Sequence, residues 1–92
     1  MIARIMGEGQ VKLDDAHFIE LNKLDDELIE AMEDGDMEGF RRTLGALLDA
    51  VRRLGTPLPD DASEPSELIL PAEDASLDEV RQMLSDDGLI PG

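Results

Sequence analysis

The chain contains no cysteine, no tryptophan and no tyrosine. The absence of cysteine excludes a disulfide, a thiol nucleophile and a cysteine-ligated metal within these residues, and it is compatible with a reducing compartment. Phe18 and Phe40 are its two phenylalanines. The core must therefore consist mainly of leucine, isoleucine, valine, methionine and alanine. From its 92 residues we expect a single domain, 1–92, built around one modest core.

Basic residues are also scarce. Eight lysines and arginines stand against 23 aspartates and glutamates, which gives a formal net charge of −15 at pH 7. A chain with this charge repels phosphate backbones and anionic lipid headgroups. We therefore expect no direct binding to nucleic acid or to a membrane surface.

Long apolar runs are missing as well. No stretch approaches the roughly 18 apolar residues that a transmembrane helix needs, and the N-terminus lacks the basic and apolar regions of a signal peptide. We therefore predict a soluble, cytoplasmic protein that does not insert into a membrane.

The N-terminal residues 1–14 have the pattern of a β-hairpin. Apolar and polar residues alternate on both sides of Gly7-Glu8-Gly9, which lacks the following helix and the Lys-Ser/Thr pair of a phosphate-binding loop and is therefore predicted to be a turn. One face of the hairpin is consistently apolar: Ala3, Ile5, Val11 and Leu13. Ile2 and Met6 lie on the opposite face, where either the C-terminal helix covers them or a second subunit contacts them. They are the candidate self-association residues of a homo-oligomer.

Residues 15–55 are predicted to form two helices. Apolar residues recur every three or four positions up to Gly35, and Asp36 begins a second such pattern that ends at Gly55. Because the link at 33–36 is too short for anything but a sharp reversal, the two helices should pack as an antiparallel hairpin with facing apolar stripes.

The remaining residues are predicted to form a loop, a strand and a helix. Prolines and acidic residues dominate 56–66, which predicts a surface loop. The run Glu67-Leu68-Ile69-Leu70 predicts a short strand that Pro71 ends, and this strand can pair with the hairpin to give a three-stranded sheet. The capping-box pattern at 76–79 predicts the start of a helix, and 87–88 predicts its end.

These elements predict an α+β fold. An N-terminal β-hairpin and a short third strand would pack on an antiparallel helix hairpin and a C-terminal helix. The expected boundaries are 1–14 for the β-hairpin, 15–55 for the helix hairpin, 56–66 for the loop, and 67–92 for the strand and helix.

His17 is the single histidine of the chain, and it lies beside Asp14 and Asp15 at the start of the first helix. A histidine next to a carboxylate can serve as a general base or a metal ligand, so a small metal-binding protein or enzyme that uses His17 and neighbouring carboxylates is one hypothesis. However, no nucleophile motif accompanies His17, and 34–36 lacks the ligand spacing of an EF-hand loop. We therefore predict no catalytic residue, no cofactor and no metal site.

Acidic residues are densest along the first helix. A compact group of them is formed by Asp25, Asp26, Glu27 and Glu30. Such a group is a solvated face, a docking face for a basic partner, or an imitation of nucleic-acid charge that occupies a nucleic-acid-binding protein. We take these four as the candidate partner-binding residues.

Four short strings rich in glycine, proline and apolar residues are distributed over nearly the whole chain. They are Ile5-Met6-Gly7-Glu8-Gly9-Gln10, Leu54-Gly55-Thr56-Pro57-Leu58-Pro59-Asp60-Asp61, Leu70-Pro71 with Ala75-Ser76-Leu77, and Asp87-Gly88-Leu89-Ile90-Pro91-Gly92. Together they resemble the PspAA family of PspA-associated proteins, which belong to the phage-shock response to envelope stress. The strings carry no chemical function, so the resemblance points to a family and not to a mechanism.

The resemblance implies a non-enzymatic protein–protein interaction module. Its partner would be a PspA-like protein, a coiled-coil protein that coats and remodels stressed inner membranes, and the chain would be peripheral to the inner membrane through this partner. Docking of the acidic group on basic helical surface of the partner would be electrostatic. The alternatives are the metal-binding protein or enzyme built on His17 and the acidic nucleic-acid mimic.

Overall fold

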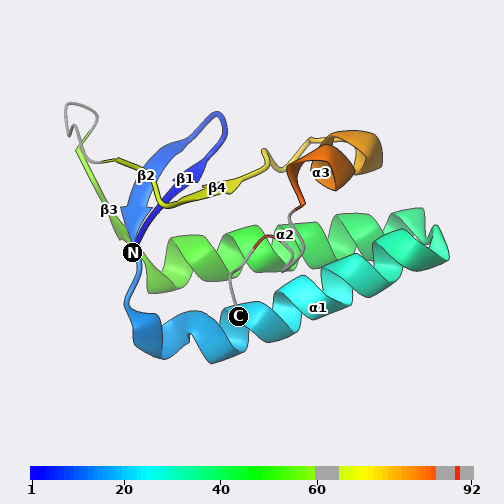
Figure 1. Ribbon diagram of the computed structural model, residues 1–92, viewed down its shortest axis with the longest axis horizontal. Coiled ribbons are helices and arrows are strands. Elements are labelled where there is room, and N and C mark those ends of the chain that lie inside the picture. Colours follow the sequence, from blue (N-terminus) through cyan, green and yellow to red (C-terminus); the bar gives the residue numbers. More distant parts are fainter. Residues whose placement is uncertain (60–64, 85–88, 90–92) are drawn as a thin grey trace.

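The fold has two layers, a four-stranded sheet and a pair of long antiparallel helices packed beside it (Figure 1). This computed structural model describes residues 1–59, 65–84 and 89. The predicted α+β class is confirmed, with an N-terminal hairpin, a further strand, a helix hairpin and a C-terminal helix.

The N-terminal hairpin forms as its alternating pattern predicts. Its strands β1 (Ile2–Ile5) and β2 (Gly9–Lys12) pair antiparallel. The Glu8 N–H donates a hydrogen bond of 2.9 Å to the Ile5 carbonyl oxygen and closes the turn. Gly7, the third residue of this turn, has a φ of +86°. A glycine adopts this conformation without the steric cost that a side chain would add.

Two further strands complete the sheet in the order β3-β2-β1-β4. Strand β4 (Leu68–Leu70) runs parallel to β1, and Ala3 lies opposite Leu68. Strand β3 (Thr56–Pro57) pairs antiparallel with β2. The sheet is therefore mixed and has one strand more than the three that we expected.

The extra strand β3 lies at the start of the range 56–66, which we expected to be a loop throughout. Gly55 leaves the preceding helix in an extended conformation, with φ −84° and ψ 158°, and so directs the chain along β2. Pro57 has no N–H to donate, and it is tolerated here because β3 is an edge strand. The Leu58 N–H then donates to a β2 carbonyl oxygen at 3.0 Å. The prolines of 56–66 predicted a loop, but pairing with β2 holds Thr56–Pro57 in an extended edge strand.

Among the described residues, four helical segments are present: the 3₁₀ turn η1 (Asp15–His17), α1 (Phe18–Asp34), α2 (Met37–Leu54) and α3 (Leu77–Met83). The Asp14 carboxylate accepts a hydrogen bond from the Ala16 N–H at 2.9 Å and caps η1, so the first helix starts with a tighter turn. The Ser76 hydroxyl accepts from the Glu79 N–H at 3.1 Å, as the capping-box pattern predicts. The predicted end of this last helix at 87–88 lies outside the described residues.

Gly35 and Asp36 reverse the chain between α1 and α2. Gly35 ends α1 in the left-handed conformation, with φ +69°. The Asp36 carboxylate accepts a hydrogen bond of 3.0 Å from the Gly39 N–H and caps α2. Because the two signals are adjacent, α1 and α2 pack directly against each other as an antiparallel pair.

A single apolar core lies between the helices and the sheet. From α2 it receives five fully buried side chains: Phe40, Leu44, Leu47, Leu48 and Val51. From the hairpin it receives the apolar face predicted by the alternation: Ala3, Ile5, Val11 and Leu13. Since α2 lies between α1 and the sheet (Figure 1), its side chains contribute to both interfaces.

We predict opposite effects of alanine at two glycines. Gly35→Ala should lower the free energy of unfolding by about 1 kcal/mol, because a Cβ is strained at this positive φ. Gly45 lies inside α2, where an added Cβ would meet Glu73 Oε1 only at 4.0 Å. Gly45→Ala should therefore raise the free energy of unfolding by about 0.5–1 kcal/mol. Urea unfolding followed by far-UV circular dichroism measures both, and a shift of the same sign for both would contradict the prediction.

Candidate functional site

The acidic group on α1 divides into a buried and an exposed part. Asp25 is only 1% exposed, and its Oδ1 accepts a hydrogen bond from the Leu89 N–H at 3.2 Å. It shares one side of the helix with Leu21 and Leu28, which belong to the core, because positions i, i+4 and i+7 lie on the same side of an α-helix. Asp25 is therefore absent from the solvated side of α1, where we expected it. Asp26, Glu27 and Glu30 are exposed as expected.

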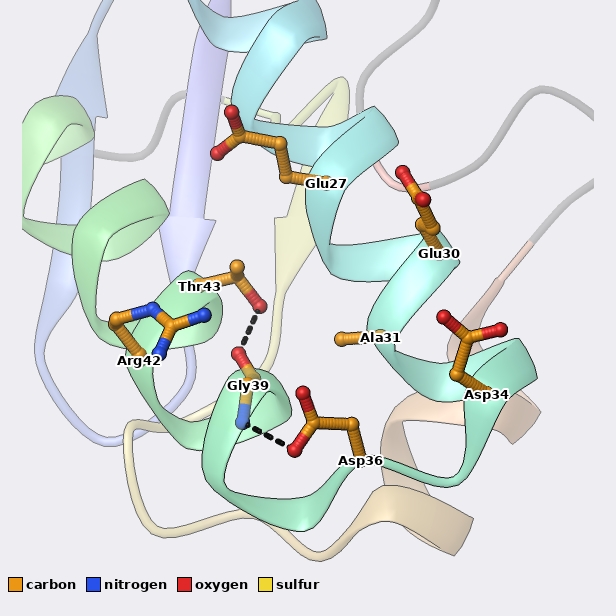
Figure 2. A pocket seen from close by; sticks show the side chains of 8 residues that line it. All are labelled: Glu27, Glu30, Ala31, Asp34, Asp36, Gly39, Arg42 and Thr43. Carbon is orange, nitrogen blue, oxygen red and sulfur yellow. Dashed lines mark hydrogen bonds between the residues drawn. The ribbon is translucent and has the colours of Figure 1, made fainter.

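Part of this exposed surface faces a cleft between α1 and α2 (Figure 2). The cleft has a volume of about 410 Å³ and lies near the turn that joins the two helices. Its ionisable side chains, which we call the acidic cleft, are Glu27, Glu30, Asp34, Asp36 and Arg42. The structure thus adds Asp34, Asp36 and Arg42 to the predicted residues, and it leaves Asp26 outside the lining.

The charge of the acidic cleft is unbalanced, with four carboxylates against one guanidinium. The Asp36 carboxylate already accepts a hydrogen bond from the Gly39 N–H. The Thr43 hydroxyl donates to the Gly39 carbonyl oxygen at 2.7 Å (Figure 2). The side chains of Glu27, Glu30 and Asp34, by contrast, make no ion pair or side-chain hydrogen bond with any described residue. Such a cleft attracts cationic side chains, and it offers little apolar surface to an uncharged ligand.

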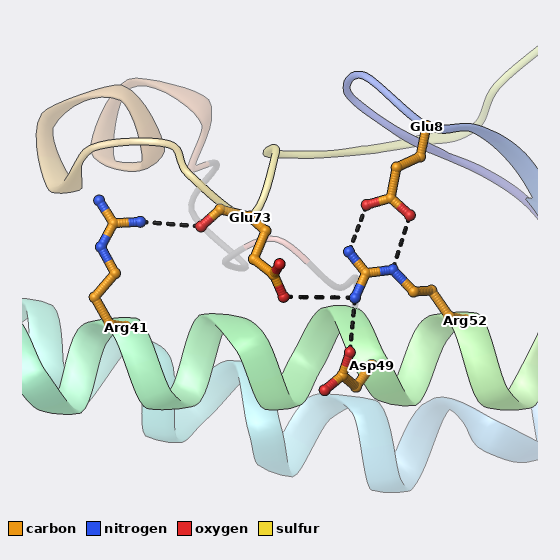
Figure 3. A network of polar contacts seen from close by, with 5 residues as sticks. All are labelled: Glu8, Arg41, Asp49, Arg52 and Glu73. Carbon is orange, nitrogen blue, oxygen red and sulfur yellow. Dashed lines mark hydrogen bonds and ion pairs between the residues drawn. The ribbon is translucent and has the colours of Figure 1, made fainter.

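A second cluster, around Arg52, joins three parts of the fold (Figure 3). The Arg52 guanidinium contacts the Glu8 carboxylate at two points, through Nε to Oε1 at 2.8 Å and through Nη2 to Oε2. Its Nη1 donates to Asp49 Oδ1 at 2.7 Å and lies 3.6 Å from Glu73 Oε1. We call these four residues the Arg52 clamp. It holds the hairpin turn and the segment that follows β4 against α2.

The Arg52 clamp keeps both members of its main pair charged. The hydrogen bond from Arg52 lowers the pKa of Glu8, while partial burial opposes this shift. The same hydrogen bond raises the pKa of Arg52 above its ordinary value. Arg52 also lies in the last turn of α2, where a cation opposes the negative end of the helix dipole. Because Glu8 is distant along the chain, no local signal could have predicted the pair.

His17 lies half-buried at the junction of η1 and α1, and its side chain makes no capping hydrogen bond. Of its two acidic neighbours, Asp14 already accepts the Ala16 N–H. Within the part of the chain that the structure describes, no three histidine, aspartate or glutamate side chains are grouped to hold a metal ion. The hypothesis of a metal-binding protein or enzyme built on His17 therefore gains no support from the geometry.

Ile2 and Met6 lie on the side of the sheet that faces away from the helices. Met6 is 47% exposed and Ile2 is half-buried. Helix α3 begins beyond the end of β4 and lies away from the hairpin (Figure 1). Self-association through these two residues stays a prediction.

Comparison with known proteins gives a family for the whole chain. A family model described as PspA-Associated protein (PspAA) matches residues 1–92. The match confirms the resemblance carried by the glycine and proline strings. No curated protein and no solved structure matches the chain.

We predict that Glu8→Gln destabilises the fold at neutral pH and that its effect disappears in acid. Because the folded pKa of Glu8 is lowered, its contribution is complete above the ordinary value of 4.5 and is lost as the pH falls through the folded pKa. Solvent screens this exposed pair, so the loss at pH 7 should be about 1 kcal/mol or less. Thermal unfolding from neutral to acidic pH measures the difference between wild type and variant.

The matched control for Glu8→Gln is Glu33→Gln. It removes one negative charge from an exposed site that makes no ion pair with any described residue. For this control, the difference in thermal unfolding from wild type should depend less on pH than it does for Glu8→Gln. If both variants behaved alike, the Arg52 clamp would not contribute to stability beyond general charge.

Proposed function

Because the chain belongs to the PspA-associated protein family, we propose that it is a non-enzymatic interaction module and an accessory partner of a PspA-like protein in the envelope-stress response. The family match supports the choice of partner. The acidic cleft supports binding as the activity, since Glu27, Glu30 and Asp34 make no ion pair with a described residue and lie on a pair of helices packed together.

The docking surface in this proposal consists of the acidic cleft together with Asp26. Lysine and arginine side chains on a helical surface of the partner would meet here the carboxylates that α1 presents and that of Asp36 in the turn before α2. The charge of −15 would accelerate the encounter with such a surface. Asp25 contributes to this surface only indirectly, because it holds Leu89 inside the fold.

The proposal also includes a place in the cell. No helix within the described residues is long and apolar enough to cross a membrane. We propose that the protein works in the cytoplasm and reaches the inner membrane through its PspA-like partner.

We predict that charge reversal in the acidic group weakens binding to the PspA-like partner. In the variant Asp26→Lys, Glu27→Lys, Glu30→Lys, repulsion replaces attraction, so the association rate should fall at least about tenfold at low salt. At high salt the difference from wild type should shrink because counterions screen the charges. Surface plasmon resonance at two salt concentrations measures this effect. Asp25 is left unchanged because a lysine there would place an unpaired charge in the core.

A control variant has the same total charge change at exposed sites outside the cleft: Asp15→Lys, Glu67→Lys, Asp74→Lys. It should slow association by much less. Equal slowing by both variants would mean that net charge, not the acidic cleft, governs binding. Capture of nucleic-acid-binding proteins in place of the PspA-like protein would overturn the proposal in favour of a nucleic-acid mimic.

A further inference from the structure

The sheet face that points away from the helices combines apolar and basic side chains. The residues that we call the outer sheet face are Ile2, Arg4, Met6, Lys12 and Ile69. Strand alternation places Gln10 and Glu67 on the same side of the sheet. Gln10 lies opposite Arg4 and is nearly buried where its Nε2 donates to Ser66 Oγ at 2.7 Å, and the exposed Glu67 lies beside Ile2. Met6 and Ile69 are 47% and 51% exposed, and they are among the large apolar side chains that the described part of the chain leaves exposed. Arg4 and Lys12 are exposed as well. This face therefore differs in character from the acidic helical layer.

The two cations of this face are available to an external group. Arg4 and Lys12 make no ion pair with a described residue, whereas Arg52, Arg53 and Arg81 each pair with a carboxylate. In the register of the sheet, Arg4 lies opposite Ile69 and Lys12 lies opposite Ile2. Side chains opposite each other on neighbouring strands are in contact range. Each cation thus stands beside an apolar side chain.

The net charge of −15 does not remove the local positive character of this face. The smaller dimensions of the molecule are 25 and 22 Å. The acidic cleft is lined by residues of α1, α2 and the turn between them, and these helices form the other layer of the fold (Figure 1). Charges are screened over about 8 Å at physiological ionic strength. The nearest ionisable groups to a segment on the outer sheet face are therefore the cations Arg4 and Lys12 and the carboxylate of Glu67, which leaves an excess of positive charge.

A second copy of the chain suits this face less well than an acidic partner. A symmetric contact between two outer sheet faces would bring Arg4 and Lys12 of both copies together. An acidic segment from another protein has complementary charge at this face.

We propose that the outer sheet face binds an acidic amphipathic helix of a protein partner. The apolar side of this helix would cover Met6 and Ile69, and its flanking carboxylates would pair with Arg4 and Lys12. A helix on this face would give the sheet a second covering layer, which is a common arrangement for sheets in α/β architectures. The module would then hold two partners of opposite charge, one on each layer. This proposal does not rest on the proposed function, because no residue of the acidic cleft takes part.

Two synthetic helical peptides with the same leucine stripe test this proposal, one flanked by glutamates and the other by lysines. Each is titrated into the isotope-labelled full chain and followed by NMR at low and high salt. The glutamate peptide should shift the amide signals of 2–6, 10–12 and 68–70 in a saturable way, and more weakly at high salt. Arg4→Glu with Lys12→Glu should weaken this binding at least about tenfold.

The matched control is Lys23→Glu with Arg81→Glu, which changes the charge equally at exposed sites on α1 and α3. It should change the affinity by no more than about twofold. Circular dichroism establishes that both double variants are folded. The lysine peptide separately tests the acidic cleft, so the two proposals can fail independently.

Several results would overturn the assignment of an acidic protein helix. One is the absence of saturable shifts with the glutamate peptide. Another is binding of this peptide to the variant Arg4→Glu, Lys12→Glu with the same affinity as to the wild type. Shifts at the outer sheet face that depend on protein concentration alone would instead assign it to a second copy. Shifts with phosphatidylglycerol vesicles but not with the glutamate peptide would assign it to anionic lipid.

Discussion

The apolar stripe of α2 is the element on which the rest of this structure depends. Its buried side chains contact α1 on one side and the sheet on the other, so one set of residues stabilises both layers. Burying such a side chain contributes about 1.5–3 kcal/mol. A two-stranded hairpin is marginal by itself, and β3 and β4 are shorter still. The sheet is therefore stable only where α2 supplies an apolar surface for it to cover.

Charged side chains act around this core and give its two layers different characters. Arg52 is used inside the fold, where it links the hairpin turn and the segment after β4 to α2. Within the described residues, the carboxylates of Glu27, Glu30 and Asp34 make no ion pair on the helical layer, and neither do Arg4 and Lys12 on the sheet. Because the apolar core separates the two layers, these charges do not neutralise each other. This distribution of charge is the basis of the binding role that we propose for the domain.

Local signals predicted most of the fold correctly. The hairpin follows from alternation around Gly7, and the helix reversal follows from Gly35 and Asp36, because each depends on residues only a few positions apart. Asp25 was expected on the solvated side because it is charged, but it lies in line with Leu21 and Leu28, and only the packing of α1 shows that this position is buried. Strand β3 was missed because the pairing partner that makes its extended conformation favourable lies in β2. The acidic cleft was predicted only on its α1 side.

The sequence by itself determined the α+β class, the positions of the turns and caps, the strongly acidic character and the family. These depend on composition, periodicity and short-range hydrogen bonds, which are readable along the chain. Only the tertiary structure decided the strand order, the inward position of Asp25, the pairing of Glu8 with Arg52 and the separation of the two charged faces. Each of these is a contact between residues far apart in the sequence. Such contacts are set by how the layers pack around α2, which no local pattern contains.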